Sequence, residues 1–402
     1  MKTIYTSILI LIFSSTSFAQ TKILFDATKA EMAGNADWII DADQFNIGYN
    51  PNAYIGGNES NPQQIPTPAQ ANVTSGTSQN YWTGALSAWA IDAVKLGYCV
   101  ETLPYKGQIT YGNTSNSQDL SHYKVFVVCE PNILFTNSEK TALMNFVQNG
   151  GGLFMISDHN NSDRNGDGYD SPHIWNDFMQ NNTVQNNPFG ITFDYEYFTE
   201  ATSNIHNSPN DPLLHGNYGD VTSVEFYGGT SITLNPLQNT TAKGVVYRTG
   251  YTNTGTTGVL CGYASYGQGK VVALGDSSPA DDGTGDNGDN LYDGWIQDAN
   301  GNHERLIMNA TIWLTQDNTS AIVSLYANPN IHFLPTTSTI RINSEGNDIY
   351  NLRITNILGQ DFLNKKIHSN QNNNVKLERN ILYFYQIRKG ATIIKIGKFI
   401  LL

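Results

Sequence analysis

The 402-residue chain is poor in charged residues, and basic residues are the scarcer kind. Only 14% of its residues are charged, and 22 Lys and Arg stand against 35 Asp and Glu, which gives a net charge of −13. Broad nucleic-acid binding surfaces need the opposite balance, so we expect no nucleic-acid partner. Aromatic residues make up 11% of the chain. That content argues against a disordered protein and predicts a buried core.

Cysteine is also scarce, since only Cys99, Cys129 and Cys261 are present. An odd number of cysteines excludes a complete disulfide framework. Each cysteine lies in an apolar, strand-like stretch, which favours buried free thiols. A single disulfide stays open for an oxidising compartment.

Long apolar runs are absent as well, and the longest early run is too short to span a membrane. Lys2 precedes the apolar residues 8–13, and Ser17-Phe18-Ala19 follows them. This order is typical of a secretory signal peptide with a small-residue cleavage site. The sequence therefore predicts a signal peptide over residues 1–19 and a protein that is secreted or held at the cell surface.

The sign of the charge reverses late in the chain, between residues 318 and 319. Residues 319–402 hold ten Lys and Arg against four Asp and Glu, whereas residues 1–318 hold twelve against thirty-one. The late segment also contains short strand-like stretches separated by turns, such as residues 338–342, 350–355 and 382–387. We therefore expect two domains, a main domain over residues 20–318 and a small β-sandwich over residues 319–402.

The late segment contains Tyr326-Ala327-Asn328-Pro329, the stretch Ile354 to Gln360 and a closing strand near Lys398. In these features it resembles the C-terminal sorting domain of the type IX secretion system of Bacteroidetes. The resemblance differs from the family pattern at Ala327 and at Asn330. It implies that the type IX secretion machinery is a partner. A generic β accessory module is the alternative.

The main domain alternates strand-like and helix-like stretches. Strands are predicted near residues 23–25, 123–129, 153–156 and 270–274. Helices are predicted near 82–96, after a cap at Asn137 or Ser138, and near 304–314. Strand–helix–strand units imply a mainly parallel sheet with helices on both faces. The predicted fold class is α/β, with a doubly wound, flavodoxin-like sheet.

Three stretches carry a family resemblance for this domain. Residues 123–128, 150–154 and 267–272 resemble the class I glutamine amidotransferase-like fold, particularly its ThuA-like exported branches. The nucleophile pattern Gly-x-Cys-x-Gly of the amidotransferases is absent. The resemblance therefore implies the fold and not glutaminase activity.

Acidic residues follow several of the predicted strands, where ligands bind in open parallel sheets. Asp26 follows the first strand, Glu130 the second, Asp158-His159 the third and Asp276 the last. If these strands are neighbours, the carboxylates converge, and a cation is their natural partner. We expect Asp158, His159 and Asp276 to hold a divalent metal, with a transition metal as one option, and Glu130 or Asp26 to accept a proton.

A second group of oxygen ligands follows in the next loop. Asp163, Asn165, Asp167 and Asp170 have the spacing of a calcium loop, and Gly168 permits its sharp turn. An EF-hand would need Glu at the twelfth position, where Ile174 stands. The loop therefore predicts a shorter calcium site, with an Asx-rich loop that binds nothing as the alternative.

These features favour a metal-dependent hydrolase that acts on an extracellular carbohydrate or ester. A serine triad at Ser277 is disfavoured because no Gly-x-Ser-x-Gly turn surrounds that residue. Aromatic residues such as Trp38, Tyr81 and Trp295 are candidate sugar-stacking groups, although aromatics more often form the core. The alternative function is a non-catalytic, calcium-stabilised glycan-binding or cell-surface protein.

Overall fold

The computed structural model divides the chain into two compact units, Met1–Asp317 and Asn318–Leu402. In the first unit it describes residues 20–33, 36–40, 68–104, 106–206, 208–285, 292–299 and 301–316. In the second unit it describes residues 332–335, 339–343, 348–356, 360–378, 382–390 and 392–400. The predicted signal peptide lies outside these residues. The division falls next to the boundary expected from the reversal of charge.

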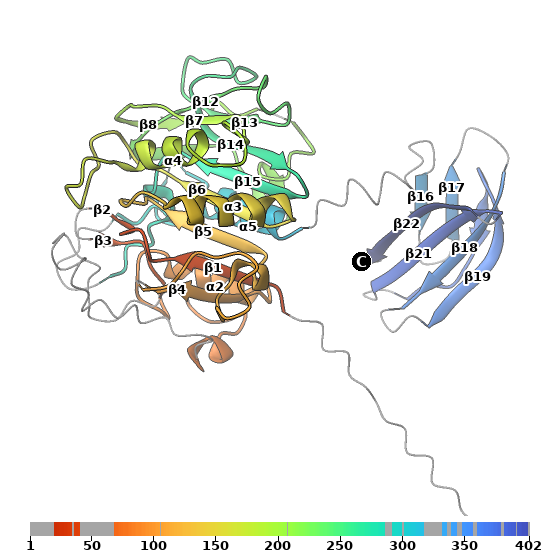
Figure 1. Ribbon diagram of the computed structural model, residues 1–402. Coiled ribbons are helices and arrows are strands. Elements are labelled where there is room, and N and C mark those ends of the chain that lie inside the picture. The colour runs from red at the N-terminus through yellow and green to blue at the C-terminus, as the bar shows by residue number, and fades with distance from the viewer. Residues whose placement is uncertain are drawn as a thin grey trace, which may run out of the picture. The chain divides into compact units, whose positions relative to one another are not determined.

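The first unit is built on a nine-stranded mixed sheet (Figure 1). Its path runs β4-β1-β5-β6-β15-β14-β12-β7, and β13 pairs with β14. The strand bounds, in the order of that path, are Cys99–Leu103, Lys22–Asp26, Val125–Cys129, Gly152–Ile156, Gly269–Leu274, Val259–Tyr266, Ile232–Leu234 and Ile191–Phe193, with β13 at Lys243–Tyr247. The pairings from β4 to β15 are parallel, and those among β15, β14, β12, β7 and β13 are antiparallel. The expected α/β class with a mainly parallel sheet is confirmed in this coarse form.

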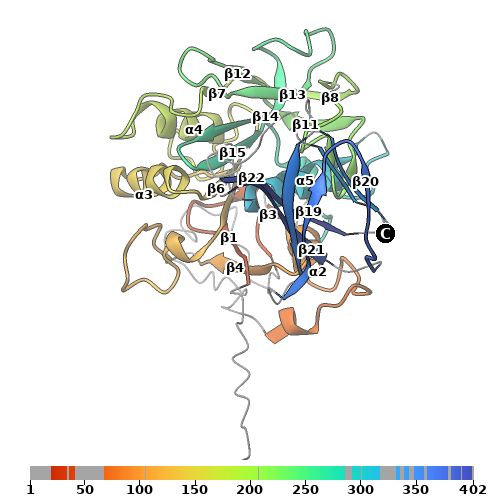
Figure 2. The same ribbon diagram turned by 90° about the vertical axis from the view of Figure 1, so that its right-hand side faces the viewer.

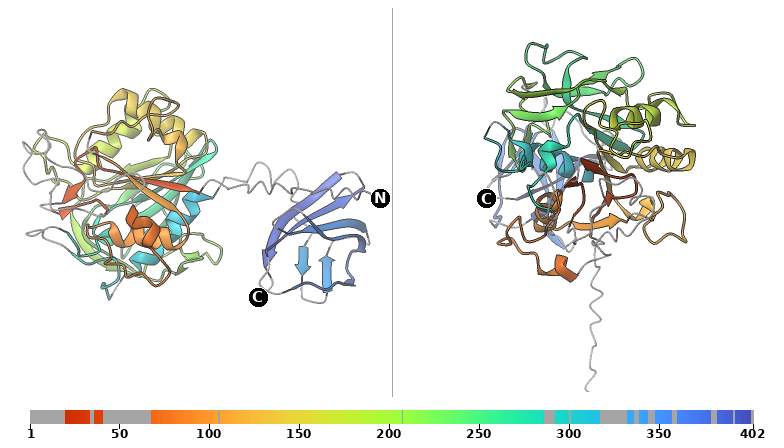
Figure 3. Two further views of the ribbon diagram at one scale, coloured as in Figure 1. Left: turned by 90° about the horizontal axis from the view of Figure 1, so that it is seen from below. Right: turned by 90° about the vertical axis from the view of Figure 1, so that its left-hand side faces the viewer.

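Four helices cover the two faces of this sheet within the described part of the chain. They are α2 (Ser87–Lys95), α3 (Asn137–Gln148), α4 (Ser171–Gln180) and α5 (His303–Thr315). Alternate residues of each parallel strand point to opposite faces. Phe25, Val127 and Phe154 therefore join the core under α2 and α5, while Phe126 and Met155 join the core under α3 and α4. Figure 2 shows these two pairs of helices on opposite sides, and Figure 3 (left) shows yellow α3 across the strands from orange α2.

The helix starts explain how the chain leaves the strands. Thr136 is the N-cap of α3 and forms a capping box with Glu139. The sequence predicted Asn137 or Ser138 as the cap, but Asn137 is already the first residue of the helix. Asp170 caps α4 by accepting the backbone N–H of His173 at 3.1 Å. The loops that precede α3 and α4 are therefore fixed by side-chain hydrogen bonds where these two helices begin.

Short strands and turns complete the first unit. The longest of these strands, β8 (Phe198–Thr202) and β11 (Val224–Gly229), pair as an antiparallel ribbon. The other short elements are β2 (Met32–Ala33), β3 (Ala36–Asp37), β9 (His215–Gly216), β10 (Gly219–Asp220) and the 3-10 turns Pro68–Asn72, Leu120–His122 and Ser278–Ala280. Cys99, Cys129 and Cys261 are all buried free thiols. No helix among the described residues is long and apolar enough to cross a membrane.

The second unit contains two antiparallel sheets that share one core. One sheet joins β16 (His332–Pro335), β17 (Thr339–Asn343) and β20 (Asn372–Asn374). The other joins β19 (Asp361–His368), β18 (Ile349–Thr355), β21 (Leu382–Lys389) and β22 (Thr392–Ile400). Ile340 and Ile342 of the first sheet pack with Leu352 and Ile354 of the second. The unit is therefore an antiparallel sandwich, as expected from the alternating pattern of its strands.

Candidate functional site

Three neighbouring parallel strands end at the same edge of the main sheet. The backbone N–H of Glu130 donates to the carbonyl of Ile156 at 3.0 Å, and that of Ser157 donates to the carbonyl of Leu274 at 2.9 Å. The residues that follow β5, β6 and β15 therefore lie side by side. The expectation that these three strand ends converge is confirmed.

Glu130 forms the floor of this cluster and is fully buried. Its Oε2 accepts hydrogen bonds from Trp38 Nε1 at 2.7 Å and Ser277 Oγ at 2.8 Å. The backbone of Glu130 has φ +48°, in the left-handed region that a Glu rarely adopts. Strained residues of this kind gather at functional sites and need support from their surroundings. Asn132 provides such support, since its Nδ2 donates to the Glu130 carbonyl at 2.9 Å.

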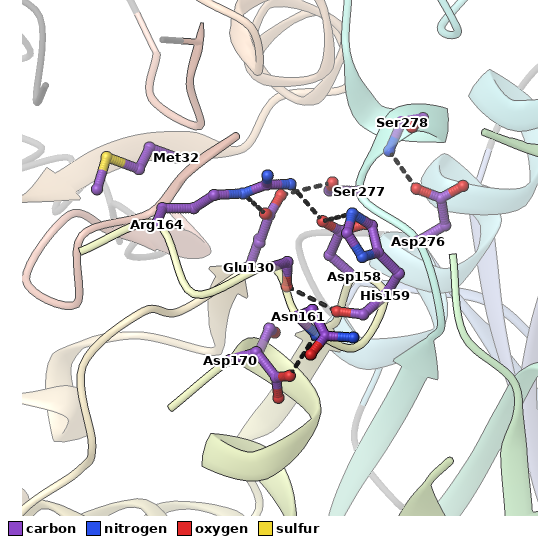
Figure 4. A network of polar contacts seen from close by, with 12 residues as sticks. Met32, Glu130, Asp158, His159, Asn161, Arg164, Asp170, Asp276, Ser277 and Ser278 are labelled. Atoms are coloured by element: carbon purple, nitrogen blue, oxygen red, sulfur yellow. Dashed lines mark hydrogen bonds and ion pairs between the residues drawn. The ribbon is translucent and has the colours of Figure 1, made fainter. Parts of the chain in front are cut away.

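Arg164 joins Glu130 to Asp158. Its Nε lies 3.1 Å from Glu130 Oε1, and its Nη2 lies 2.8 Å from Asp158 Oδ2, so one guanidinium bridges two buried carboxyl groups (Figure 4). The backbone N–H of Arg164 donates to Asn132 Oδ1 at 3.0 Å, which anchors the loop. The positive charge expected among these carboxylates is therefore provided by a side chain of the chain itself. No sequence pattern pointed to Arg164, although it is the one Lys or Arg in the acidic stretch 157–170.

Asp158 is buried and is held in an environment that disfavours its charge. Burial raises its pKa well above the ordinary value of 3.8, and the negative charges of Glu130 and Asp276 raise it further. Arg164 opposes this shift without cancelling it. Asp158 is therefore a candidate proton donor.

His159 has the opposite shift. Burial lowers its pKa below 6.5. Its Nδ1 lies 2.6 Å from the carbonyl oxygen of Asn160, a contact that requires the proton on Nδ1 and leaves Nε2 as an acceptor. Nε2 lies 3.6 Å from Asp158 Oδ2 (Figure 4). The side chain is 18% exposed, so the imidazole is reachable from solvent.

Asp276 is fully buried and is fixed by backbone groups. Its Oδ2 accepts the N–H of Tyr227 at 2.6 Å, and its Oδ1 accepts the N–H of Ser278 at 2.9 Å. Burial raises its pKa to about 7. Its oxygens thus hold β11 and the turn after β15 together. Among the described residues no three or more His, Cys, Asp or Glu side chains are grouped so as to hold a metal ion. A divalent metal at Asp158, His159 and Asp276 stays a prediction.

Asp26 lies at the end of β1 in a separate pair with Glu31. Both side chains are buried, and burial raises the pKa of Asp26 to about 6 and that of Glu31 well above 4.5. The nearby ammonium of Lys29 is paired with Glu139 at 2.7 Å. These shifts favour a bound proton in the Asp26–Glu31 pair, and the role of Asp26 as a proton acceptor stays a prediction.

The predicted calcium loop uses its oxygens on its own backbone. Asp163 Oδ1 accepts the N–H of Gly166, and its Oδ2 accepts that of Gly168, each at 2.8 Å. Asn165 Oδ1 accepts the N–H of Asp167 at 3.1 Å. Asp170, the fourth expected ligand, is the cap of α4 and also accepts the N–H of Asn161 at 2.7 Å. These contacts order the loop and leave its use for calcium a prediction.

Two further expectations concern Ser277 and the aromatic residues. Ser277 donates to Glu130. Trp38 and Trp295 are each only 2% exposed and belong to the core, so the idea that they stack on sugars is wrong, whereas Tyr81 is 47% exposed. The exposed aromatic ring that contacts His159 is that of Tyr197, which lies just before the short strand β8. No sequence pattern marks this position.

Comparisons with known proteins found similar solved structures but no matching family model or curated protein. Among solved structures the chain is similar to the mmIFT52 N-terminal domain, at 14% identity and a TM-score of 0.42, over 73% of this chain and 97% of that chain. It is also similar to the Cytoplasmic Protein STM3548 from Salmonella typhimurium, at 15% identity and a TM-score of 0.36, over 73% and 98%. Neither likeness assigns a function here.

Proposed function

We propose that the main unit is a hydrolase in which His159 is the general base and Asp158 the general acid. The proposal is supported by two adjacent groups where three strand ends meet, His159 Nε2 and Asp158 Oδ2, which lie 3.6 Å apart. Burial raises the pKa of the Asp158 carboxyl and lowers that of the His159 imidazole. Environments that push neighbouring pKa values apart are how acid and base roles are assigned in known enzymes.

The chemistry follows from the atoms present. A water molecule loses a proton to His159 Nε2 while its oxygen bonds to the electrophilic carbon of the substrate. The bond from that carbon to the leaving oxygen breaks, and the leaving oxygen takes the proton of Asp158. Arg164 then stabilises the Asp158 carboxylate. His159 Nε2 and Asp158 Oδ2 lie 3.6 Å apart, so the proton returns from Nε2 to Oδ2 through one water molecule and closes the cycle.

In this proposal the strand-end cluster around Asp158 acts without a bound metal ion. Coordination of a cation by Asp158 would compete with Arg164, which already contacts that carboxyl group. Calcium therefore remains a proposal for the loop Asp163 to Asp170, where Asp163, Asn165 and Asp167 are at least partly exposed. There it would order the segment that carries Arg164.

The finer family assignment is also a proposal. The parallel strands from β4 to β15 with helices on both faces support an amidotransferase-like, doubly wound fold, and the antiparallel strands beyond β15 are an extension of it. The separate antiparallel sandwich supports a type IX sorting domain and hence a secreted or surface-held protein. Deletion of residues 320–402 should keep the protein in the periplasm, and normal release of the truncated chain would refute the sorting role.

The hydrolase proposal is tested with chromogenic esters, chromogenic glycosides and soluble polysaccharides. We expect His159→Ala and Asp158→Asn each to lower kcat at least about 100-fold, the usual contribution of general acid–base groups. His122→Ala, at an exposed histidine, is the matched control and should have no effect. Unchanged turnover in His159→Ala contradicts the proposal. Carbohydrate binding without any turnover would favour the non-catalytic glycan-binding alternative.

A further inference from the structure

The three most exposed aromatic side chains among the described residues lie on or just before the strands of one antiparallel ribbon, β8 with β11. Tyr197 is 67% exposed, Tyr227 is 61% exposed and Tyr195 is 50% exposed. Tyr227 belongs to β11, and the other two lie in the segment that leads into its partner β8. Single exposed aromatics are common, but a group of them marks a contact surface.

This group is attached directly to the candidate site. The ring of Tyr197 meets His159 edge-on, with 4.4 Å between the ring centroids. The carbonyl of Glu196 accepts the N–H of Asn160 at 2.9 Å, and the N–H of Tyr227 donates to Asp276. Tyr197 and Tyr227 are therefore fixed to the loops after β6 and β15.

A β-bulge sets the position of the second ring. The register of β8 and β11 shifts between Tyr227 and Gly229, and Gly228 has φ +90°. A Cβ at Gly228 would lie 3.3 Å from Tyr197 Cε2 and 3.5 Å from His159 Cδ2, so the chain passes close to both rings. Bulges beside active sites commonly re-aim a side chain. Tyr227 stacks on Tyr292 at 5.2 Å and 16°, which supports one face of its ring.

We infer that Tyr197 and Tyr227 form a stacking surface for the pyranose rings of a polysaccharide. The C–H groups on the face of a sugar ring carry slight positive charge and pack against the negative face of an aromatic ring. The sugar hydroxyls remain free to reach His159, Asp158 and the tyrosine hydroxyls. Ligand sites combine aromatic surface with a few polar groups in this way. The inference rests on the proposed hydrolase site and selects carbohydrate over a simple ester as its substrate.

The test measures binding separately from catalysis. Affinity gel electrophoresis of the full chain carrying Asp158→Asn is run in barley β-glucan, xylan, polygalacturonate and dextran. At least one polysaccharide should retard the protein. Tyr197→Ala and Tyr227→Ala should each weaken that binding about tenfold, as expected for an aromatic ring that the bound sugar covers. Tyr227→Phe should retain it because the ring remains. Tyr251→Ala, at a tyrosine that is 40% exposed beside Arg248, is the control and should bind normally.

The outcomes separate the two proposals. Retardation that survives both Tyr→Ala changes, or no retardation by any of the four polysaccharides, overturns the stacking surface. Ester hydrolysis by the wild-type protein with no polysaccharide binding leaves the hydrolase standing and removes the carbohydrate assignment. Tyrosine-dependent binding with no hydrolysis leaves the stacking surface standing and removes the hydrolase.

Discussion

Asp26 and Glu31 form one pair of buried carboxyl groups at the edge of the sheet, and Glu130 and Asp158 form another on neighbouring strands. In both pairs the doubly ionised form is unfavourable, because two negative charges repel each other strongly when they are buried away from water. Arg164 bridges the second pair. In the first pair the nearest ammonium, that of Lys29, is paired with Glu139, and the raised pKa values of Asp26 and Glu31 favour a bound proton in its place.

The difference shows how the same residue types become structural or chemical. The Asp26–Glu31 pair is closed to solvent, since Asp26 is 2% exposed and Glu31 is fully buried. The pair with the guanidinium adjoins a partly exposed imidazole and exposed tyrosines. A mobile proton is useful only where substrate can reach it, so we assign chemistry to Asp158 and structure to Asp26.

The largest expected effect comes from removing the bridge. Arg164→Met leaves Glu130 and Asp158 without their cation, and such a loss at a buried pair typically costs about 3 kcal/mol of unfolding free energy. Urea unfolding at pH 7 measures it. Arg305→Met, at an exposed arginine, should change stability by less than about 0.5 kcal/mol. Equal unfolding free energies of the two variants would mean that Arg164 does not stabilise the buried carboxyl groups of Glu130 and Asp158.

The next effect concerns the bound proton of the Asp26–Glu31 pair. The folded-state pKa of Asp26, about 6, lies above the ordinary 3.8, so the folded chain binds more protons and loses stability as pH rises through about 6. Asp26→Asn removes that titration. Between pH 4 and 7 the wild type should therefore lose about 2–3 kcal/mol more unfolding free energy than the variant. Parallel curves from urea unfolding across this range would contradict a bound proton at Asp26.

The smallest effect concerns the exposed carboxylates of the loop that carries Arg164. Asp167→Ala removes contacts to solvent-exposed backbone and should lower stability by less than about 1 kcal/mol without calcium. If the loop binds calcium, millimolar calcium raises the Tm of the wild type by mass action and no longer raises that of the variant. His159→Ala should keep the calcium effect. Loss of the effect in both variants would mean one shared site.

Much of this arrangement could be predicted from the sequence. The apolar runs and the helical stripes determine which strands are buried, and the parallel order brings the residues after them to one edge. Glu130, Asp158 and His159 were found in this way. The sandwich of the second unit was found from the alternation in Tyr350, Leu352 and Ile354.

The contacts within the site were not predictable in the same way. Arg164 and Asp276 lie in loops, where no periodicity tells which way a side chain points. The left-handed backbone of Glu130 has no signature in residue type. The short antiparallel strands β12 and β7 have only three residues each, too few for a pattern.

The central claim is that His159 is a neutral base with its proton on Nδ1, and NMR of the imidazole nitrogens tests it most directly. The protein is labelled with nitrogen-15 in histidine and titrated from pH 4.5 to 8.5, and His159→Gln identifies the signals. We expect a pKa below 6.5 and, at pH 7, a protonated Nδ1 with an unprotonated Nε2. In Arg164→Met the pKa should rise, because the guanidinium charge helps to lower it. An imidazole that stays charged at pH 7, or one with its proton on Nε2, would contradict the account.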